Sequence, residues 1–300
     1  MNEKRNKRFM QIIRNVHGLF KNDDIDKNRN SQDHLGNILS HDKHYEFISD
    51  SVNNIHCEWT KYNNNQSSES ENIIFYCHGG GYMTGSCLYA RGITTKLSKY
   101  TSCNVFCFDY RLSPENPYPA ALQDALIAWN YILSKGCDPN SIIVAGDSAG
   151  GNLALALTMH LRDSNSLLPK CLILFSPWTD LTASGDSFNT KADLDPVLNS
   201  EYIAKATKCY LDGQDPNYPY ISPLFGNFIS FPPVYIHVGE NEILLDDSTR
   251  LHKILLSNNV YAKLDIYSGM WHVFQLAPIK QAKESIIKTA KFITEVSHNT

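Results

Sequence analysis

Six short apolar runs alternate with segments of helical length along most of the chain, and this alternation most strongly constrains the fold. The runs lie at 73–77, 103–108, 141–146, 171–175, 233–238 and 262–267, and the helical segments at about 87–100, 117–135, 149–162, 200–211, 246–258 and 279–296. Strands that are apolar on both faces are typical of a parallel sheet, because helices then cover both sides. The pattern therefore predicts an α/β fold.

Two further strands are expected before this alternation, as a hairpin over 44–49 and 54–62. They bring the expected sheet to eight strands. A polar stretch over 21–37 precedes them and is too hydrophilic to pack by itself, so we expect a mobile connector there. The interval between 175 and 233 is much longer than one crossover needs, and we interpret it as an insertion.

Composition narrows the range of partners. The net charge of −4 at pH 7 is spread along the chain, which gives no electrostatic reason to expect a nucleic acid. No stretch approaches the roughly 18 consecutive apolar residues of a membrane-spanning helix. Eight cysteines without metal-ligand spacing favour reduced thiols, a cytoplasmic location and no metal site. We therefore expect a cytoplasmic protein that acts on a small molecule.

The first twenty residues are expected to form an amphipathic helix. Its apolar stripe, opposite a basic face, consists of Phe9, Ile12, Ile13, Val16 and Phe20. Such a helix can cover a binding pocket or lie on a membrane surface. The first role is favoured, because the stripe is short and no second anchoring signal accompanies it.

A serine stands on the turn between the run at 141–146 and the helical segment at 149–162. The residues Gly-Asp-Ser-Ala-Gly at 146–150 fit G-x-S-x-G, the strained elbow that exposes a serine oxygen between a strand and a helix. A catalytic serine needs such a mount and a neighbouring base, because its hydroxyl is otherwise a poor nucleophile. We predict that Ser148 is a nucleophile; the alternative is a serine that only caps the helix.

A glycine run after the strand at 73–77 predicts donors for an oxyanion. Acyl transfer builds negative charge on the carbonyl oxygen of the substrate, and glycines let backbone N–H groups approach that oxygen. The expected donors are the N–H groups of Gly79, Gly80 and Ala149. A phosphate-binding loop is disfavoured, because neither GxGxxG nor GxxxxGK[ST] is present.

His272 is the expected general base. In a fold with this elbow, the acid and then the histidine follow the serine, each on a loop after a late strand. His272 comes just after the run at 262–267 and a loop glycine. The other histidines after the serine fall within expected helices, a strand or the tail: His160, His237, His252 and His298.

Glu242 is the expected acid, which holds the imidazole and balances its charge. It lies in the loop immediately after the run at 233–238. Asp246 and Asp247 fall where the next helix begins, where carboxylates also act as caps or dipole partners. Asp246 remains the alternative acid.

Longer motifs stand in a fixed order around these residues. They are HGGGY (78–82), DYRLSPENPYPAALQDALIAW (109–129), GDSAGGNLALAL (146–157), SPWTDLT (176–182), PPVYIHVGENEILLDDS (232–248) and GMWHVF (269–274). With them the chain resembles the hormone-sensitive-lipase-like family of α/β-hydrolases, bacterial esterase type, over about 73–275. It is most similar to members labelled monoterpene ε-lactone hydrolases, which carry Glu where the wider family more often carries Asp.

The resemblance implies an α/β-hydrolase fold with a mostly parallel, eight-stranded sheet flanked by helices. A helical cap of residues 1–43 and 180–216 would cover a catalytic domain of residues 44–179 and 217–300. Tyr82 and Ile243 stand beside catalytic positions and are candidates for lining the substrate pocket, although simple packing explains them equally well. A homodimer is a further expectation.

The expected function is a serine carboxylesterase. It would hydrolyse short- to medium-chain carboxylic esters with water, through an acyl-enzyme and without a metal or organic cofactor. Lactone, acetyl-carbohydrate and amide hydrolysis stay open as alternatives, because the same nucleophile serves all of them. A non-enzymatic ligand receptor on the same scaffold is disfavoured, because such receptors have lost the histidine that this chain keeps as His272.

Overall fold

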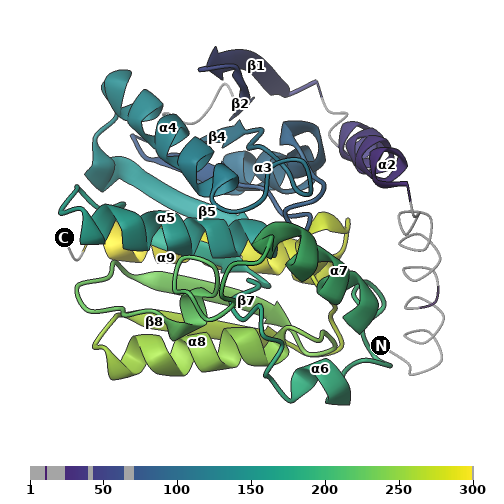
Figure 1. Cartoon of the computed structure of the whole chain (residues 1–300). Coiled ribbons are helices and arrows are strands. Elements are labelled where there is room, and N and C mark those ends of the chain that lie inside the picture. Colours follow the sequence, from purple (N-terminus) through teal and green to yellow (C-terminus); the bar gives the residue numbers. More distant parts are fainter. Residues whose placement is uncertain (1–10, 12–23, 40–42, 64–70, 299–300) are drawn as a thin grey trace.

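The protein is built around one eight-stranded sheet, shown by a computed structural model that describes residues 11, 24–39, 43–63 and 71–298 (Figure 1). The strands are β1 (Tyr45–Val52), β2 (Ile55–Tyr62), β3 (Ile73–Cys77), β4 (Asn104–Phe108), β5 (Ile142–Asp147), β6 (Cys171–Phe175), β7 (Val234–Gly239) and β8 (Ala262–Tyr267). Their order in the sheet is β1-β2-β4-β3-β5-β6-β7-β8. β2 is antiparallel to β1 and β4, and all other neighbours are parallel, which confirms the predicted sheet.

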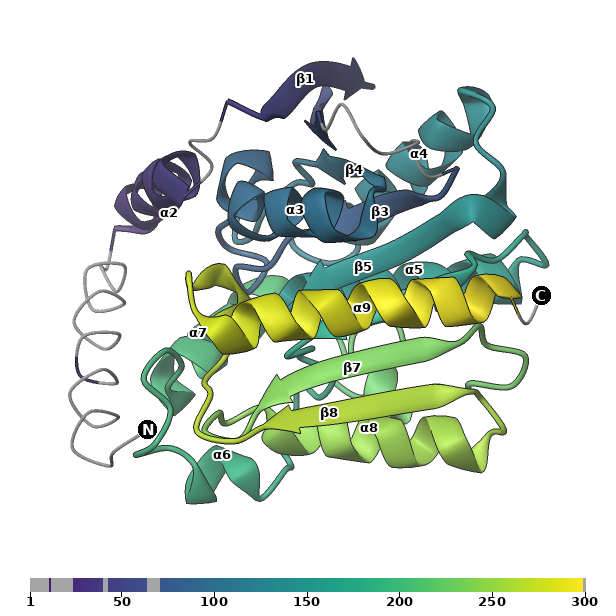
Figure 2. The same cartoon turned by 180° about the vertical axis from the view of Figure 1, so that it is seen from behind.

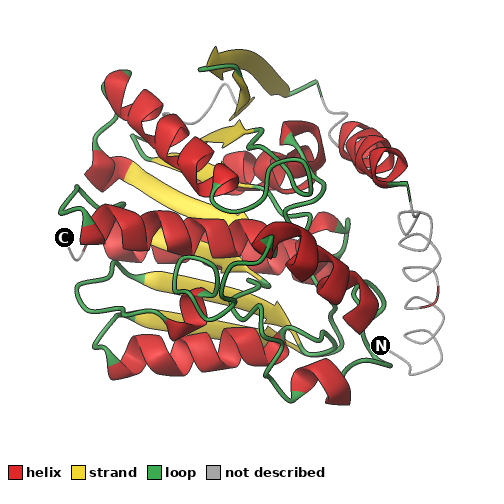
Figure 3. Ribbon diagram, viewed as in Figure 1, coloured by secondary structure: helices red, strands yellow, loops and turns green. Residues whose placement is uncertain are grey.

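Helices cover both faces of the sheet. They are α3 (Cys87–Thr101), α4 (Ala120–Ser134), α5 (Ala149–Asp163), α8 (Leu245–Ser257) and α9 (Lys280–His298). α4, α5 and α8 lie on the face turned to the viewer in Figure 1, and α3 and α9 lie on the face seen in Figure 2. Figure 3 shows the strands between these two helical layers.

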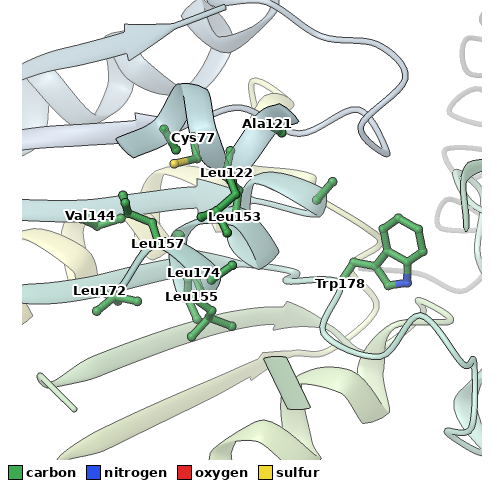
Figure 4. Close-up of a cluster of buried hydrophobic side chains, with 14 of the residues drawn as sticks. Cys77, Ala121, Leu122, Val144, Leu153, Leu155, Leu157, Leu172, Leu174 and Trp178 are labelled. Carbon is green, nitrogen blue, oxygen red and sulfur yellow. The ribbon is translucent and has the colours of Figure 1, made fainter. Parts of the chain in front are cut away.

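Successive side chains along the parallel strands point to opposite faces of the sheet, and the hydrophobic core therefore has two parts. Phe75 and Val144 point to the face of α4, α5 and α8, whereas their neighbours Ile74 and Ile143 point to the face of α3 and α9. Figure 4 shows the first part, in which Leu153 and other side chains of α5 pack on strand residues. Because both faces are buried, β3 and β6 are apolar at every position, which is the pattern that predicted them, whereas the edge strand β8 also carries Lys263 and Asp265.

The predicted hairpin is present as β1 and β2. Asn53 and Asn54 form its two-residue turn, with φ angles of 48° and 66°. Asparagine tolerates this left-handed backbone, which suits the twist of the flanking strands.

The connector predicted over 21–37 is wrong for the part that the structure describes. Residues Ile25–Leu39 form helix α2, which packs on α3. Arg29 pairs with Glu115 at 2.8 Å, and Asp33 accepts a hydrogen bond from Ser86. Gly36 lies so close to Leu88 that a Cβ at this position would collide with the Leu88 carbonyl. This polar helix is attached through side-chain pairs that hydrophobicity does not reveal.

The first twenty residues, apart from Gln11, lie outside the described residues, and so does the predicted apolar stripe. Within the described chain, no helix has both the length and the apolar character needed to cross a bilayer.

The long interval after β6 contains α6 (Ser187–Thr190) and α7 (Ser200–Leu211). Tyr210 of α7 stacks on Tyr82, with ring centroids 3.7 Å apart and an interplanar angle of 3°. Tyr202 donates a hydrogen bond to the carbonyl of Gly80 at 3.3 Å. The insertion thus lies over the loop that follows β3, at the carboxyl edge of the sheet.

Candidate active site

Ser148 occupies a strained turn between β5 and α5. Its φ of 54° and ψ of −120° place it in a backbone region that non-glycine residues rarely adopt. A Cβ on Gly146 would collide with the carbonyl of Gly150, and one on Gly150 would collide with that of Cys77. The two glycines therefore let α5 begin directly against the sheet. The Ser148 side chain makes no capping hydrogen bond to α5, so the helix-cap interpretation does not account for it.

The hydroxyl of Ser148 faces His272, which lies in the loop after β8. His272 Nε2 is 2.9 Å from Ser148 Oγ, and His272 Nδ1 is 2.8 Å from Glu242 Oε2. Because Nδ1 faces a carboxylate, Nδ1 carries the ring hydrogen and Nε2 is left to accept the serine proton. Ser148 is 9% exposed, His272 5% and Glu242 0%, so bulk water competes little for these hydrogen bonds.

Opposing effects act on the pKa of His272. Burial alone would lower it, because the charged imidazolium is poorly solvated there. The hydrogen bond and negative charge of Glu242, followed by the charges of Asp195 and Asp147, outweigh burial and raise the pKa above its ordinary value. The site is therefore arranged to stabilise a protonated imidazole.

Glu242 is held on both of its oxygens. Its Oε1 accepts hydrogen bonds from the N–H of Gly239 at 2.6 Å and from the hydroxyl of Ser176 at 2.9 Å. Ser176 Oγ also accepts the N–H of Val273 at 3.1 Å, so one side chain connects the acid to the histidine loop. No role is predicted for Ser176 from the sequence. Its position directly after β6, at the same edge of the sheet, was the available signal.

The alternative acid, Asp246, points elsewhere. Its Oδ2 accepts the N–H of Ser187 in the insertion at 2.9 Å. Asp247 accepts the N–H groups of Thr179 and Asp180. Both carboxylates lie in the first turn of α8 and hold neighbouring loops, which excludes Asp246 as the partner of the imidazole in this structure.

The glycine run needs one correction. The N–H of Gly79, an expected oxyanion donor, donates to Asp147 Oδ1 at 2.9 Å and is not free for a substrate. In the part of the chain that the structure describes, the N–H groups of Gly80, Gly81 and Ala149 have no acceptor. Gly80 and Gly81 have φ angles of 116° and 63°, which turn the loop after Gly79. The free donors are thus displaced by one residue along the loop.

Asp147 ties this loop to the elbow. Besides Gly79, its carboxylate accepts the hydroxyls of Tyr76 at 2.7 Å and Tyr89 at 3.0 Å. It is fully buried, and burial raises its pKa even though the hydroxyls of Tyr76 and Tyr89 oppose the rise. Its position beside Ser148 gives no sequence signal of this role, because any residue fits the second place of the motif.

Tyr82 and Ile243, the two candidates for lining the pocket, have packing roles here. Tyr82 is 1% exposed and donates its hydroxyl to Asn152 at 2.8 Å. Ile243 is fully buried. Within the described part of the chain, this burial favours packing over pocket lining for both side chains.

One group of potential metal ligands occurs among the described residues. His56, Cys87 and Asp109 place one ligand atom each within 4.8 Å of one another. They lie on β2, at the start of α3 and after β4, and Asp109 also accepts the N–H of Cys87. None of them is a partner of Ser148, His272 or Glu242.

The sequence of this chain is similar to a protein family and to individual proteins of known name. A family profile described as an alpha/beta hydrolase fold matches residues 74–276, a span that contains Ser148, Glu242 and His272. An esterase of Acinetobacter venetianus is 38% identical over 227 residues, which cover 75% of this chain and 75% of that protein. An acetyl-hydrolase of Streptomyces hygroscopicus is 34% identical over 221 residues, or 73% of each chain.

The likeness extends to solved structures. A crystal structure described as an esterase from the bacterial hormone-sensitive lipase (HSL) family superposes with a TM-score of 0.91 at 31% identity. The superposition covers 98% of this chain and 99% of that one.

Proposed function

The chain belongs to the bacterial hormone-sensitive-lipase family of α/β-hydrolases and hydrolyses carboxylic esters, and from this premise we propose that Ser148, His272 and Glu242 form its catalytic triad. One observation carries the proposal. A continuous path of hydrogen bonds leads from Ser148 Oγ through both ring nitrogens of His272 to Glu242 Oε2.

In the first half of the reaction, Ser148 Oγ attacks the carbonyl carbon of the ester while His272 Nε2 takes the hydroxyl proton. Glu242 keeps the ring oriented and balances the positive charge that forms on it. The tetrahedral intermediate then expels the alcohol, which takes the proton from Nε2. An acyl group remains on Ser148.

In the second half, a water molecule takes the place of the alcohol. His272 Nε2 removes a proton from this water as its oxygen attacks the acyl carbon. Collapse of the second intermediate returns the proton to Ser148 and releases the carboxylic acid. The triad ends in its starting protonation state, so each cycle consumes one ester and one water.

Gly80, Gly81 and Ala149 are proposed as the oxyanion donors. Among the described residues, their N–H groups have no acceptor and come from the loop after β3 and from the first residue of helix α5. The positive end of that helix dipole favours a negative charge at this point. Losing one such donor typically costs about 3 to 4 kcal/mol in the transition state.

Short- to medium-chain esters are the proposed substrates. Residues of the insertion contact the glycine loop after β3, and Ser148 is only 9% exposed. A series of p-nitrophenyl esters of increasing acyl length tests this, with Ser148→Ala as the control. We expect kcat/KM to be highest for short acyl chains and the Ser148→Ala variant to be inactive. A maximum at long acyl chains would contradict the proposal.

Lactone hydrolysis is the second candidate. The resemblance to monoterpene ε-lactone hydrolases rests on a glutamate at the acid position, and Glu242 is the carboxylate that contacts His272. A lactone is an internal ester, so its carbonyl meets the same nucleophile and donors. Turnover of an ε-lactone, compared with that of a linear ester of equal size, distinguishes the two candidates.

Three wider features of the molecule complete the proposal. We propose that residues 1–43 and 180–216 form a cap over a catalytic domain of residues 44–179 and 217–300. The contacts of α7 with the loop after β3 support the second cap segment, whereas most of the first segment lies outside the described residues. None of the eight cysteines, all of which lie in the described part of the chain, forms a disulfide, which agrees with a reducing, cytoplasmic location. A homodimer, which light scattering would detect, stays a prediction.

A further inference from the structure

Two side chains of the insertion hold the backbone of Ile243, the residue that follows Glu242. Asp195 Oδ2 accepts the N–H of Ile243 at 3.0 Å. Ser187 Oγ donates to the carbonyl of Ile243 at 2.6 Å. Both backbone polar groups of Ile243, its N–H and its carbonyl, are therefore held from outside the loop that carries Glu242. The position of Glu242 depends on residues that lie about 50 positions away in the chain.

Asp195 is itself rigidly held. The second carboxylate oxygen of Asp195, Oδ1, accepts the N–H groups of Val197 and Leu198 at 2.8 and 2.9 Å. Asp195 is only 5% exposed. A buried carboxylate with three backbone donors has little freedom to move. The turn over Asp195–Leu198 and the acid loop thus share one carboxylate.

The charge of Asp195 also influences His272 and Glu242. Burial raises the pKa of Asp195 to about 6, the charge of His272 opposes the rise, and the charge of Glu242 adds to it. In turn, Asp195 is one of three carboxylates, with Glu242 and Asp147, whose charges raise the pKa of His272. These carboxylates come from the insertion, from the loop after β7 and from the turn between β5 and α5, and Glu242 is the one that contacts the imidazole among the described residues.

We propose that Asp195 is a positioning residue for ester hydrolysis: it fixes the backbone beside Glu242 and supplies a further negative charge to the imidazolium that forms at His272. This inference rests on the proposed function of the triad. It makes the insertion part of the catalytic machinery rather than only a cover over the substrate.

The two ties to Ile243 provide a matched comparison. Asp195→Asn keeps the size of the side chain and one acceptor oxygen but removes the charge. Asp195→Glu keeps the charge and both oxygens. Ser187→Ala removes the other tie to Ile243 without changing any charge near His272. For each variant, kcat, KM and the pH dependence of kcat/KM are measured with p-nitrophenyl acetate, and the midpoint of thermal unfolding shows whether the variant is folded.

For Asp195→Asn, we expect kcat to fall while KM changes little, because the carboxylate contacts backbone N–H groups of the protein and is placed in no contact with the substrate. The acidic limb of the kcat/KM profile should move to lower pH, since losing a nearby negative charge lowers the pKa of His272. In both Asp195→Glu and Ser187→Ala, kcat/KM should fall on acidification at the same pH as in the parent protein. Asp195→Ala removes both effects, and misplacing the acid can then cost up to about 100-fold in kcat.

The proposal is overturned if folded Asp195→Asn keeps both the kcat and the acidic limb of the parent. It is also overturned if Asp195→Asn and Ser187→Ala change only the unfolding midpoint. If Asp195→Asn does not fold, Asp195→Glu is compared with Ser187→Ala. Because Asp195→Glu keeps the negative charge, a shift of its acidic kcat/KM profile away from that of the parent contradicts the proposal. Ser148→Ala separates this result from a failure of the triad: turnover by that variant refutes the triad itself.

Discussion

The N–H of Gly79 donates to Oδ1 of Asp147 at 2.9 Å, so the residue before Ser148 holds the glycine loop that follows β3. Tyr76 and Tyr89 donate to the same carboxylate. The elbow and the oxyanion loop, from different parts of the chain, are thereby fixed relative to each other without contact with a substrate.

Asp147→Ala should destabilise the protein strongly. It leaves two buried tyrosine hydroxyls and the N–H of Gly79 without their acceptor. Each unsatisfied buried donor costs roughly 1 to 3 kcal/mol, so we expect the free energy of unfolding to fall by about 3 kcal/mol or more. Urea denaturation measures this. Tyr76→Phe serves as the control, because it removes one donor together with its hydrogen bond, and an equal loss in both variants would contradict the explanation.

A phosphonate bound covalently to Ser148 should reveal the oxyanion donors. We expect its phosphoryl oxygen to lie about 3 Å from the backbone nitrogens of Gly80, Gly81 and Ala149. The nitrogen of Gly79 should remain bonded to Asp147. A crystal structure of the adduct checks both distances. An oxygen bonded to Gly79, with Asp147 turned away, would restore the donor set expected from the sequence.

Glu242→Gln and Asp246→Asn should differ sharply. The first variant removes the charge that balances the imidazolium, and we expect kcat to fall by roughly 10³-fold or more. The second affects a carboxylate that holds Ser187, so kcat should change by less than about tenfold. Steady-state kinetics on folded protein compares them. Loss of turnover in Asp246→Asn alone would reverse the assignment.

The pH dependence should report the raised pKa of His272. The base acts only when neutral, so kcat/KM should decline on acidification with an apparent pKa above 6.5. In Glu242→Gln this limb should move to lower pH, because the main source of the shift is removed. A limb at or below pH 6.5 in the parent would show that burial dominates at this histidine.

The same shift has a consequence for stability. The folded pKa of His272 is raised above its unfolded value, so its interaction with Glu242 stabilises the fold fully below that unfolded value. This contribution is lost as the pH rises through the folded pKa. Unfolding measured across this range in the parent and in Glu242→Gln isolates the contribution.

The main elements of the fold could be predicted because burial on both faces leaves a clear mark on parallel strands. Runs such as 141–146 and 171–175 coincide with β5 and β6 to within one residue. Helix α2 could not be predicted in this way. Its attachment depends on Arg29 meeting Glu115 and Asp33 meeting Ser86, and such pairs have no periodicity.

The residues of the proposed triad could be selected by their order and by the loops that carry them. The oxyanion donors could not be selected to the residue, because the side chain of Asp147 decides which N–H is free. Asp195 lies in an irregular part of the insertion, and only its contact with Ile243 reveals its importance.

The shared hold on Ile243 limits how this enzyme can diversify. A foreign insertion can bring a new substrate pocket but lack an acceptor at position 195 and a donor at position 187. The buried N–H and carbonyl of Ile243, next to Glu242, would then have no hydrogen-bond partner. Natural recombination and engineered loop exchange therefore have to transfer these two side chains together with the pocket.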